Sequence, residues 1–382
     1  MPGDALPRRR LVYVSGTRAD FGLMKATLLR LAQSMDLSVA VTGMHLAPRF
    51  GQTIDDIRAA GLRICGEVAV DVETRTPPSM SAAIGHELVG LTDVLARERP
   101  EIVLLLGDRG EMLAGAVAAL HLGIVSVHLH GGERSGTVDE PVRHAISKLC
   151  TYHLVASAES RERLIRMGEA PDRVVVTGAP GLDGLVQDAA MPAPAVREAL
   201  DLAGDEPFLL ALFHPVVQQS GQARVQTLAV LDALHRIGLP VVWLEPNADA
   251  GSLGVLQALD ERGLPPGSRR LVHLSPRALF VSAMRQAAVL VGNSSAGIIE
   301  AASLGTPVVN VGDRQRQRER NANVTDVQPL TDDVHAALVA AIAHGPWPCE
   351  NRYGDGQAGA RIAQFLLQCP LDAELLEKSN FY

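Results

Sequence analysis

The sequence predicts an α/β protein in which two Rossmann-like, doubly wound domains face one another across a cleft. Short apolar runs alternate with longer helical patterns, which is typical of parallel sheets covered by helices. The alternation breaks in a looser stretch near residues 184–194 and then restarts, so two similar halves are expected. A chain of 382 residues is long enough for two domains of ordinary size.

The first domain is expected over residues 9–188. Its strands are short and apolar, as strands buried on both faces of a parallel sheet are. The predicted strands are Leu11–Val14, Leu37–Val41, Ile102–Leu106, Ser126–Leu129, Tyr152–Val155 and Val174–Thr177. The helices expected between them are Phe21–Ser34, Ile54–Gly61, Met80–Arg99, Met112–Leu122, Arg143–Lys148 and Ser160–Met167.

The second domain is expected over residues 189–355 and repeats the pattern. Its predicted strands are Phe208–Phe213, Val241–Leu244, Arg270–Leu274, Val289–Val291 and Val308–Asn310. Its predicted helices are Ala223–Ile237, Gly254–Glu261, Pro276–Gln286, Gly297–Leu304 and Thr331–Ala343. Residues 356–382 are expected to form a C-terminal helix and tail that pack back on the first domain. The default ligand site is the crevice outside the carboxyl ends of both sets of strands.

Composition excludes several classes of function. A net charge of −8 argues against general nucleic-acid binding, which normally shows as a basic excess. No run approaches the ~20 apolar residues of a membrane span, and the apolar run at 11–16 is too short for a signal peptide, so a cytoplasmic protein without a membrane partner is expected. The four cysteines lie far apart without a CxxC pair, so neither a zinc knuckle nor a redox motif is indicated.

Two strand ends in the first half carry charged residues. After the first strand, Gly16 allows close approach of the backbone, and Arg18 and Asp20 are candidate ligand-binding residues at the start of the helix. A plain βα turn with a solvated arginine is the alternative. Asp108 follows the strand 102–106 and is a candidate acid or base, with a helix cap near Glu111 as the alternative.

The densest cluster of ionisable groups spans residues 128–144, directly after the fourth predicted strand. His130, Glu133, Asp139 and Glu140 are candidate catalytic residues, and Arg143 is a candidate binding residue. Three glycines let this loop bend beside a ligand. Two of its histidines are spaced to share a face of a strand, but no third ligand has a recognisable spacing, so no metal is expected.

The second half presents polar residues at the same kind of strand end. His214 and Asn247 each follow a predicted strand and are candidate binding residues. A strand, a hydroxylic turn and a helix follow one another over residues 289–300. There, Ser294, Ser295 and the free N–H groups of the helix beginning at Gly297 can cradle a diphosphate, and Glu300 can accept hydrogen bonds from a ribose. An ordinary serine-capped helix is the alternative.

These motifs together resemble one family, the hydrolysing UDP-N-acetylglucosamine 2-epimerases of the GT-B fold. The resemblance spans about residues 10–330 in conserved order of motifs. Its most specific parts are HGGE with the following DE and RHA, and GNSSAGIIE. The matching segments are GTRADFG (16–22), GDRGEM (107–112), HLHGGE (128–133), DEPVRHAISKL (139–149), FHPV (213–216), PNAD (246–249), GNSSAGIIE (292–300) and GDRQ (312–315).

The resemblance implies a reaction. The nucleotide leaves C1 of a UDP-amino sugar by anti elimination, with loss of the C2 proton, and water then adds to give the free 2-epimer. The implied substrate is UDP-N-acetylglucosamine or a UDP-2,4-diacetamido-2,4,6-trideoxyglucose, for sialic- or legionaminic-type acids. No cofactor is expected. The protein is expected to be a homo-oligomer, either a dimer or a tetramer. Asp108, Glu133, Asp139 and Glu140 are the candidate acid and base groups, and the resemblance leaves their individual roles open.

One departure and three alternatives accompany the resemblance. Gln317 stands where a glycine is usual, while Arg314, a candidate nucleotide contact, and Arg318 keep the charge of that loop. A non-hydrolysing epimerase is one alternative, although its HVEAG-type loop differs from HGGE. A GT-B glycosyltransferase would need an acceptor. A non-catalytic sugar-nucleotide sensor would have little use for carboxylates beside a diphosphate.

Overall fold

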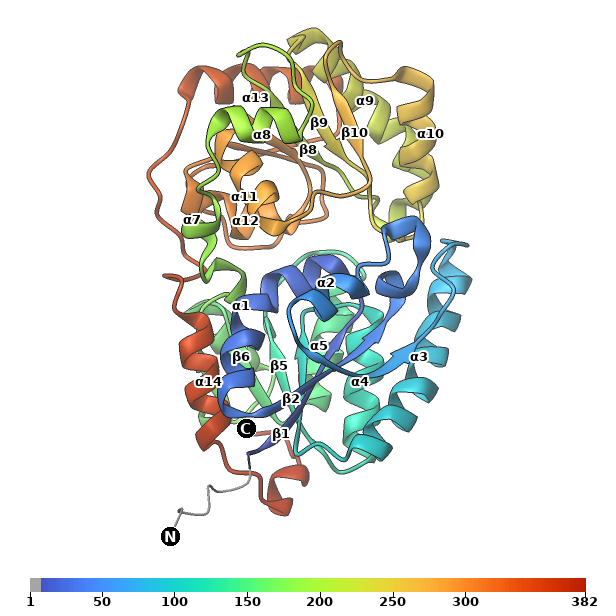
Figure 1. Cartoon of the computed structure of the whole chain (residues 1–382), viewed down its shortest axis with the longest axis vertical. Coiled ribbons are helices and arrows are strands. Elements are labelled where there is room, and N and C mark those ends of the chain that lie inside the picture. The colour runs from blue at the N-terminus through green and yellow to red at the C-terminus, as the bar shows by residue number, and fades with distance from the viewer. Residues whose placement is uncertain (1–7) are drawn as a thin grey trace.

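The computed structural model describes residues 8–382, which form two parallel sheets with helices packed against them (Figure 1). The first sheet has seven strands in the order β3-β2-β1-β4-β5-β6-β7, and the second has six in the order β10-β9-β8-β11-β12-β13. Every strand pair in both sheets is parallel. Both orders follow the doubly wound Rossmann pattern, which confirms the predicted fold class.

The first half contains the strands β1 to β7 and the helices α1 to α6. The strands are β1 Arg10–Ser15, β2 Asp36–Thr42, β3 Arg63–Val68, β4 Ile102–Leu106, β5 Val125–Leu129, β6 Tyr152–Val155 and β7 Val174–Val176. The helices are α1 Arg18–Ser34, α2 Ile54–Ala59, α3 Pro77–Glu98, α4 Gly110–His121, α5 Asp139–Leu149 and α6 Ala158–Arg166. Short 3₁₀ turns are η1 Gly43–Leu46, η2 Pro48–Phe50 and η3 Pro171–Arg173.

The second half contains β8 to β13 and the helices α8 to α13, and it is reached through η4 Pro180–Leu182 and α7 Leu185–Asp188. The strands are β8 Leu209–Leu212, β9 Val241–Leu244, β10 Arg269–Leu271, β11 Val289–Gly292, β12 Val308–Val311 and β13 Val324–Val327. The helices are α8 Ala193–Ala199, α9 Ala223–Ile237, α10 Ser252–Arg262, α11 Arg277–Gln286, α12 Ser295–Ile299 and α13 Thr331–His344, with η5 Val217–Gln222 and η6 Ala301–Leu304. Helix α14 Ala358–Gln368 and the turn η7 Ala373–Leu376 end the described chain.

The switch point of each sheet determines where a ligand can lie. In the first sheet the strand order reverses between β1 and β4, and in the second between β8 and β11. The loops that leave these four strands therefore border the two crevices. At the end of β11, Gly292 has φ +136°, and a Cβ there would lie 2.0 Å from the backbone oxygen of Leu212, so only glycine allows the two strands to end this close together.

Local capping explains where α1 begins. The sequence pattern predicted the helix from Phe21, whereas it starts at Arg18, because Thr17 is its N-cap. The Thr17 hydroxyl accepts a hydrogen bond from the Asp20 N–H at 3.2 Å, and the Asp20 carboxylate accepts from the Thr17 N–H at 2.6 Å. This reciprocal capping box adds one helical turn to the predicted element.

The chain crosses between the halves twice. The first crossing leads through η4 and α7 into the second half, and the second returns after α13 to α14, which packs against α1 (Figure 1). Ala358, Ile362 and Leu366 of α14 join the apolar core formed by β1, β2 and α1. Asp183, in the first crossing, caps α14: its carboxylate accepts from the N–H groups of Ala358 at 2.8 Å and Gly359 at 2.6 Å.

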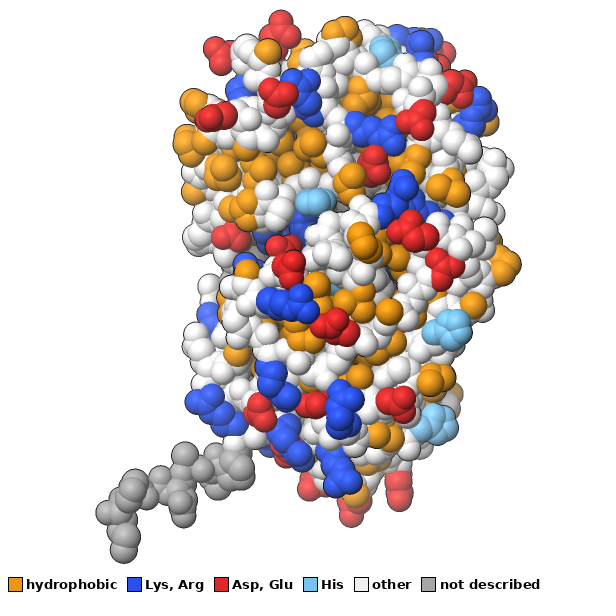
Figure 2. All heavy atoms as spheres, turned by 45° about the vertical axis from the view of Figure 1, so that its right-hand side comes forward, with side chains coloured by type: hydrophobic (Ala, Val, Ile, Leu, Met, Phe, Trp, Pro, Cys, Tyr) orange, Lys and Arg blue, Asp and Glu red, His pale blue; other side chains and the backbone are white. Residues whose placement is uncertain are grey.

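The surface mixes charges of both signs. Figure 2 shows Lys and Arg side chains interspersed with Asp and Glu side chains over the face that it presents. Among residues 8–382, no helix combines the length and the apolar character that crossing a membrane requires.

Candidate active site

A cavity of about 290 Å³ lies between the two halves, where the N-terminal end of α1 faces the carboxyl ends of the second sheet. Apolar residues such as Phe50, Leu274 and Phe280 supply part of its wall, and polar residues converge on it, as in small-molecule sites generally. Most of the predicted binding residues line it: Arg18, His214, Asn247, Ser294, Ser295, Glu300 and Arg314.

The turn between β11 and α12 forms one wall of the cavity. Ser294 is the N-cap of α12, and its hydroxyl oxygen accepts from the Ala296 N–H at 3.4 Å. Asn293 fixes the turn to the end of β8, because its side chain accepts from the His214 N–H at 2.7 Å and donates to the His214 oxygen at 2.8 Å. The sequence analysis missed Asn293, although it lies within the GNSS motif.

Gly297 lies on the opposite side of α12 from this cavity wall. A Cβ there would lie 3.0 Å from the Val308 side chain and 3.1 Å from that of Leu290, so glycine lets the helix pack closely on β11 and β12. Its contact with a ligand stays a prediction.

Glu300 is buried and has a basic partner. Its Oε1 accepts from Nη2 of Arg277 at 2.5 Å, and the same nitrogen donates to the Gly181 oxygen at 2.8 Å. Arg277 also lines the cavity and was not predicted. The pair places one buried carboxylate and one cation at this wall, where a ribose hydroxyl can bind the carboxylate and a phosphate can bind the cation.

Arg18 and Asp20 occupy different positions despite their closeness in sequence. The Arg18 guanidinium lines the cavity with Nε 3.6 Å from Oδ2 of Asp56. The Asp20 carboxylate is buried in the β1–α1 turn, where Tyr13, Ser15 and the capping N–H groups donate to it. Asp20 therefore holds the shape of the turn that presents Arg18, and direct contact of Asp20 with a ligand stays a prediction.

His214 is a neutral imidazole. Burial, together with the nearby charge of Arg314, lowers the pKa of His214 to about 3. Its Nδ1 lies 3.4 Å from the Asn247 N–H, which donates to it. The ring can therefore donate a hydrogen bond from Nε2 into the site without carrying a charge.

Asp108 and Arg143 form a partly buried ion pair at the carboxyl end of the first sheet. Arg143 Nη2 donates to Oδ2 of Asp108, and Arg143 Nη1 donates to the His130 oxygen at 2.8 Å. The Arg143 side chain is 1% exposed, whereas Asp108 keeps 19% of its side chain exposed toward the crevice. Arg109, and not Asp108, is the N-cap of α4, so the capping alternative for Asp108 is wrong.

Glu133 is enclosed by cations. Its Oε1 accepts from Nδ1 of His130, its Oε2 accepts from Nη1 of Arg318, and Arg143 Nη1 lies 3.9 Å from Oε2. Burial alone would raise the pKa of Glu133, but the charge of Arg318 and the bond to His130 outweigh it and hold that pKa well below its usual range. Glu133 therefore favours its ionised form, and both of its oxygens are occupied.

His130 has an unusual backbone conformation. Its φ of +61° lies in the left-handed region, which costs a non-glycine residue of order 1 kcal/mol or more. Its N–H donates to Leu154 and its oxygen accepts from Arg143, so β6 and α5 hold the strained backbone. Such strain, kept by surrounding hydrogen bonds, is typical of functional sites.

Asp139 is the first residue of α5 and faces Asp108. Burial and the neighbouring Asp108 charge raise the pKa of Asp139, while Arg314 acts in the opposite direction. Arg314 Nη2 lies 3.8 Å from Oδ2 of Asp139, and 29% of the Asp139 side chain is exposed. Asp139 is thus a carboxyl group that retains a proton more readily than usual, next to Arg314, which lines the cavity.

Glu140 points into its own loop. Its Oε2 accepts from the N–H groups of Ser135 at 3.1 Å and Gly136 at 2.7 Å, and these bonds outweigh the effect of burial to lower its pKa. The carboxylate closes the loop that carries Glu133. Glu140 lies in the first turn of α5, next to Asp139, and its role in proton transfer stays a prediction.

Arg109 makes a further ion pair between the two halves. Arg109 Nε is 2.9 Å from Oε1 of Glu111, and its Nη1 is 3.4 Å from Oδ1 of Asp249 in the second half. A Cβ on Gly16 would lie 2.2 Å from that Glu111 oxygen, so the glycine of the first turn makes room for this carboxylate. The sequence analysis missed both Arg109 and Asp249.

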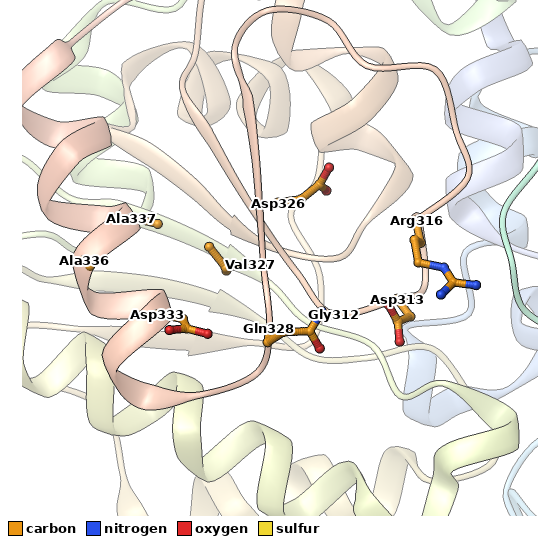
Figure 3. Close-up of a pocket in the computed structure, with 9 residues that line it drawn as sticks. All are labelled: Gly312, Asp313, Arg316, Asp326, Val327, Gln328, Asp333, Ala336 and Ala337. Carbon is orange, nitrogen blue, oxygen red and sulfur yellow. The ribbon is translucent and has the colours of Figure 1, made fainter.

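A larger cavity of about 550 Å³ lies away from these groups, between β13, the first turns of α13 and the loop after β12 (Figure 3). Three carboxylates, Asp313, Asp326 and Asp333, line it beside Arg316, which makes it a poor site for a diphosphate. Within residues 8–382, no three His, Cys, Asp or Glu side chains are grouped so as to hold a metal ion.

Comparisons with known proteins show which family the sequence matches. The model of the family described as UDP-N-acetylglucosamine 2-epimerase matches residues 28–367. The chain is 46% identical to a UDP-N,N'-diacetylbacillosamine 2-epimerase (hydrolyzing) from Legionella pneumophila, an alignment that covers 98% of this chain and all of the relative. It is 29% identical to a GDP/UDP-N,N'-diacetylbacillosamine 2-epimerase (hydrolyzing) from Campylobacter jejuni, over 84% of this chain and 85% of the relative.

The solved structures support the fold. A UDP-GlcNAc 2-epimerase from Neisseria meningitidis, crystallised with UDP-GlcNAc, superposes with a TM-score of 0.78 at 20% identity, over 94% of this chain and 99% of that one. Two Rossmann-like halves across a cleft are therefore an arrangement that this chain shares with known proteins.

Proposed function

The chain belongs to the UDP-N-acetylglucosamine 2-epimerase family, and from that premise we propose that it is a hydrolysing 2-epimerase, which releases UDP and the free 2-epimer of an acetamido sugar. The observation that carries this proposal is that the residues expected to bind the nucleotide and the carboxylates expected to transfer protons meet at Arg314. Arg314 lines the cavity between the two halves, and it also reaches Asp139 among the carboxylates of the first half.

We propose a UDP-linked 2,4-diacetamido-2,4,6-trideoxyglucose, UDP-N,N'-diacetylbacillosamine, as the substrate. The relative named for that activity is 46% identical to this chain over its whole length. UDP-N-acetylglucosamine is the second candidate, and the name of the Campylobacter relative also admits a GDP-linked sugar. The product would feed the synthesis of legionaminic- or sialic-type acids. A homo-oligomer in the cytoplasm is part of the same proposal.

The first step needs a stabilised leaving group. In the proposed elimination a base removes the proton at C2, the electron pair forms the C1–C2 double bond, and the C1–oxygen bond breaks to release UDP. Ser294, Ser295 and Arg314 are suited to hold the diphosphate, because donors already fixed in place stabilise charge that develops in the transition state.

Asp108 is the proposed base for this step. Its bond with Arg143 fixes the direction of the carboxylate, while 19% of the Asp108 side chain stays exposed. Glu133 is less suited, since both its oxygens are occupied and its pKa is strongly depressed.

Asp139 is the proposed acid for hydration. Water then adds its OH to C1 of the glycal and a proton returns to C2 on the opposite face, which inverts that centre. The raised pKa of Asp139 suits a group that must carry a proton before giving it away. Its ion-pair partner Arg314 is also the cation expected to bind the diphosphate. The nucleotide would therefore leave from a position next to the carboxyl group that delivers this proton.

The decisive experiment offers the protein several sugar nucleotides without an acceptor. Incubation with UDP-N,N'-diacetylbacillosamine, UDP-GlcNAc and their GDP counterparts, followed by NMR and mass spectrometry, should give free UDP and a free 2-epimer. A nucleotide-linked epimer would instead indicate a non-hydrolysing epimerase. Dependence on an added acceptor would indicate a GT-B glycosyltransferase, which the two-domain architecture alone does not exclude.

A further inference from the structure

Arg318 of the second half makes a buried ion pair with Glu133 of the first. The two side chains are 7% and 1% exposed, and Nη1 of Arg318 donates to Oε2 of Glu133. Removing one partner of a buried ion pair leaves an uncompensated charge, which is strongly unfavourable. Glu133 therefore has this environment only while the two halves are together.

The loop that carries Arg318 is hydrogen-bonded to the turn between β11 and α12. Arg314 Nη1 donates to the Asn293 oxygen at 3.2 Å, and Gln315 Nε2 donates to the same oxygen at 3.1 Å. Asn293 immediately precedes Ser294 and Ser295. Arg318, four residues after Arg314 in the same loop, contacts Glu133. A continuous set of contacts thus leads from the expected diphosphate site to the first half.

Glu133 links Arg318 to His130, because it binds both side chains. Its other oxygen, Oε1, accepts from Nδ1 of the His130 ring, and His130 is the residue with the strained backbone at the end of β5. The bond fixes the ring orientation and directs Nε2 away from Glu133. The charged and titratable groups that face Glu133 are His130, Arg143, Arg318 and the hydroxyl of Tyr353.

We infer that Arg318 is a positioning residue, which orients His130 through Glu133. The part of the site in the first half, which is expected to hold the sugar, is therefore complete only when the second half, which is expected to hold the nucleotide, is closed over it. The inference rests on the proposed function for its catalytic meaning. Arg318 does not line the cavity and need not touch the substrate. Its role differs from that of Arg314 in the same loop, which lines the cavity directly.

The test compares three variants of the full-length protein. Arg318→Met removes the charge and keeps an unbranched stem, and Arg318→Lys restores a cation. Arg316→Met is the matched control, because Arg316 belongs to the same loop but lines the separate cavity of about 550 Å³ beside β13 and α13 (Figure 3). The first readout is NMR of ¹³C-labelled glutamate and ¹⁵N-labelled histidine, with Glu133→Gln and His130→Gln used to assign the signals.

In Arg318→Met the pKa of Glu133 should rise by more than one unit, since the charge that lowers it most is gone, and the ring signal of His130 should shift. Arg318→Lys should restore most of both values, and Arg316→Met should leave them as in the wild type. An unchanged Glu133 pKa and His130 signal in a folded Arg318→Met protein would overturn the inference.

Kinetics give the second readout. Arg318→Met should lower kcat on the order of 10- to 100-fold, the scale seen when a group supporting a reactive residue is removed. Its KM and its affinity for UDP should change less than 3-fold, and the acid limb of its pH–rate profile should move to higher pH. In a Glu133→Gln background the same substitution should add little.

The two readouts separate the two proposals. A wild-type protein that turns over no sugar nucleotide but shows the NMR changes would count against the proposed function alone. An active wild type whose kcat is insensitive to Arg318→Met, or a loss confined to UDP affinity, would overturn the positioning role.

Discussion

Arg314 touches both sides of the candidate active site. Its Nη1 donates to the Asn293 oxygen at 3.2 Å, beside the serine turn, and its Nη2 lies 3.8 Å from Oδ2 of Asp139. A bound diphosphate would compete with Asp139 for this cation. As the diphosphate takes up the positive charge, the influence that lowers the pKa of Asp139 weakens, and the carboxyl group holds its proton more firmly.

This relationship predicts distinct defects for the two aspartates. Asp108→Asn should lower kcat by roughly 10²-fold or more and block loss of the C2 proton. Asp139→Asn should impair hydration more than elimination, so that UDP and an unsaturated sugar accumulate. Rapid-quench analysis by mass spectrometry measures both. If Asp139→Asn released no UDP while Asp108→Asn still did, the two roles would be reversed.

Solvent hydrogen should enter the product at C2. In D₂O we expect one deuterium at C2 of the released sugar, because the proposed mechanism breaks the C2–H bond and later forms a new one. Glu133→Gln should lower kcat by roughly 10²-fold as well, because it removes the negative charge that holds His130 and Arg318, while UDP binding stays nearly intact. NMR of the product would sink the elimination mechanism if it showed the original hydrogen retained at C2.

Ser295 should contribute directly to nucleotide binding. Ser295→Ala is expected to weaken UDP binding by about 1 kcal/mol, the usual value of one hydrogen bond. Isothermal titration calorimetry with UDP measures the change. Ser81→Ala, on the exposed face of α3, serves as the control and should bind like the wild type. Equal affinity in both variants would remove Ser295 from the diphosphate site.

Glu300 should act on binding more than on turnover. Glu300→Ala leaves Arg277 without its carboxylate partner and removes the acceptor expected to hold the ribose. KM should therefore rise more than kcat falls, which steady-state kinetics with the native substrate will measure. The reverse pattern, a low kcat at unchanged KM, would assign Glu300 to the chemical step.

Activity should not depend on a divalent ion. The arginines and N–H groups of the cavity can carry the charge of the leaving diphosphate, so EDTA should leave kcat unchanged. The control is an assay with added Mg²⁺ or Mn²⁺ after chelation. A complete loss of activity that either ion restores would contradict this expectation.

The stability of the protein should fall as pH rises from mildly acidic to mildly alkaline values. Glu87 on α3 is 4% exposed, and burial together with the charge of Glu111 raises its pKa to about 8. In the unfolded chain a glutamate titrates near ~4.3, so between these values the folded state binds more protons and the free energy of unfolding decreases with pH. Its stabilising contribution is therefore complete in acid and lost as pH passes through the folded pKa.

Urea denaturation at pH 5, 7 and 9 tests this dependence. Glu87→Gln imitates the protonated form and should flatten the decline, whereas Glu73→Gln, at an exposed position, should not. Parallel pH curves for Glu87→Gln and the wild type would show that Glu87 is ionised at neutral pH.

The central strands could be predicted because burial on both faces leaves a continuous apolar run. β4, with the sequence IVLLL, is buried throughout. The edge strands β3 and β13 were missed, because each has exposed or polar residues on its open side, as in VTDV of β13. Helix α5 begins at Asp139, four residues before its predicted start, since the acidic first turn resembles a loop in sequence.

The site could be predicted only in part for a similar reason. Residues such as Asp108 and Ser294 follow strands directly, and the carboxyl ends of parallel strands meet at one edge. Arg318 and Arg277 contact partners that topology alone does not bring near, and no local pattern pairs Glu133 with a residue 185 positions away. The excess of arginine after Gly312 was the one available signal.

The capping of α14 by Asp183 has a consequence for how the chain folds as it is made. The first half is interrupted: its core needs Ile362 and Leu366, which leave the ribosome only after the whole second half. The second half can therefore complete its sheet while the first still exposes an apolar groove along α1. A truncated chain ending before Ala358 would keep every residue of the site, yet lose a helix from the domain that carries the carboxylates.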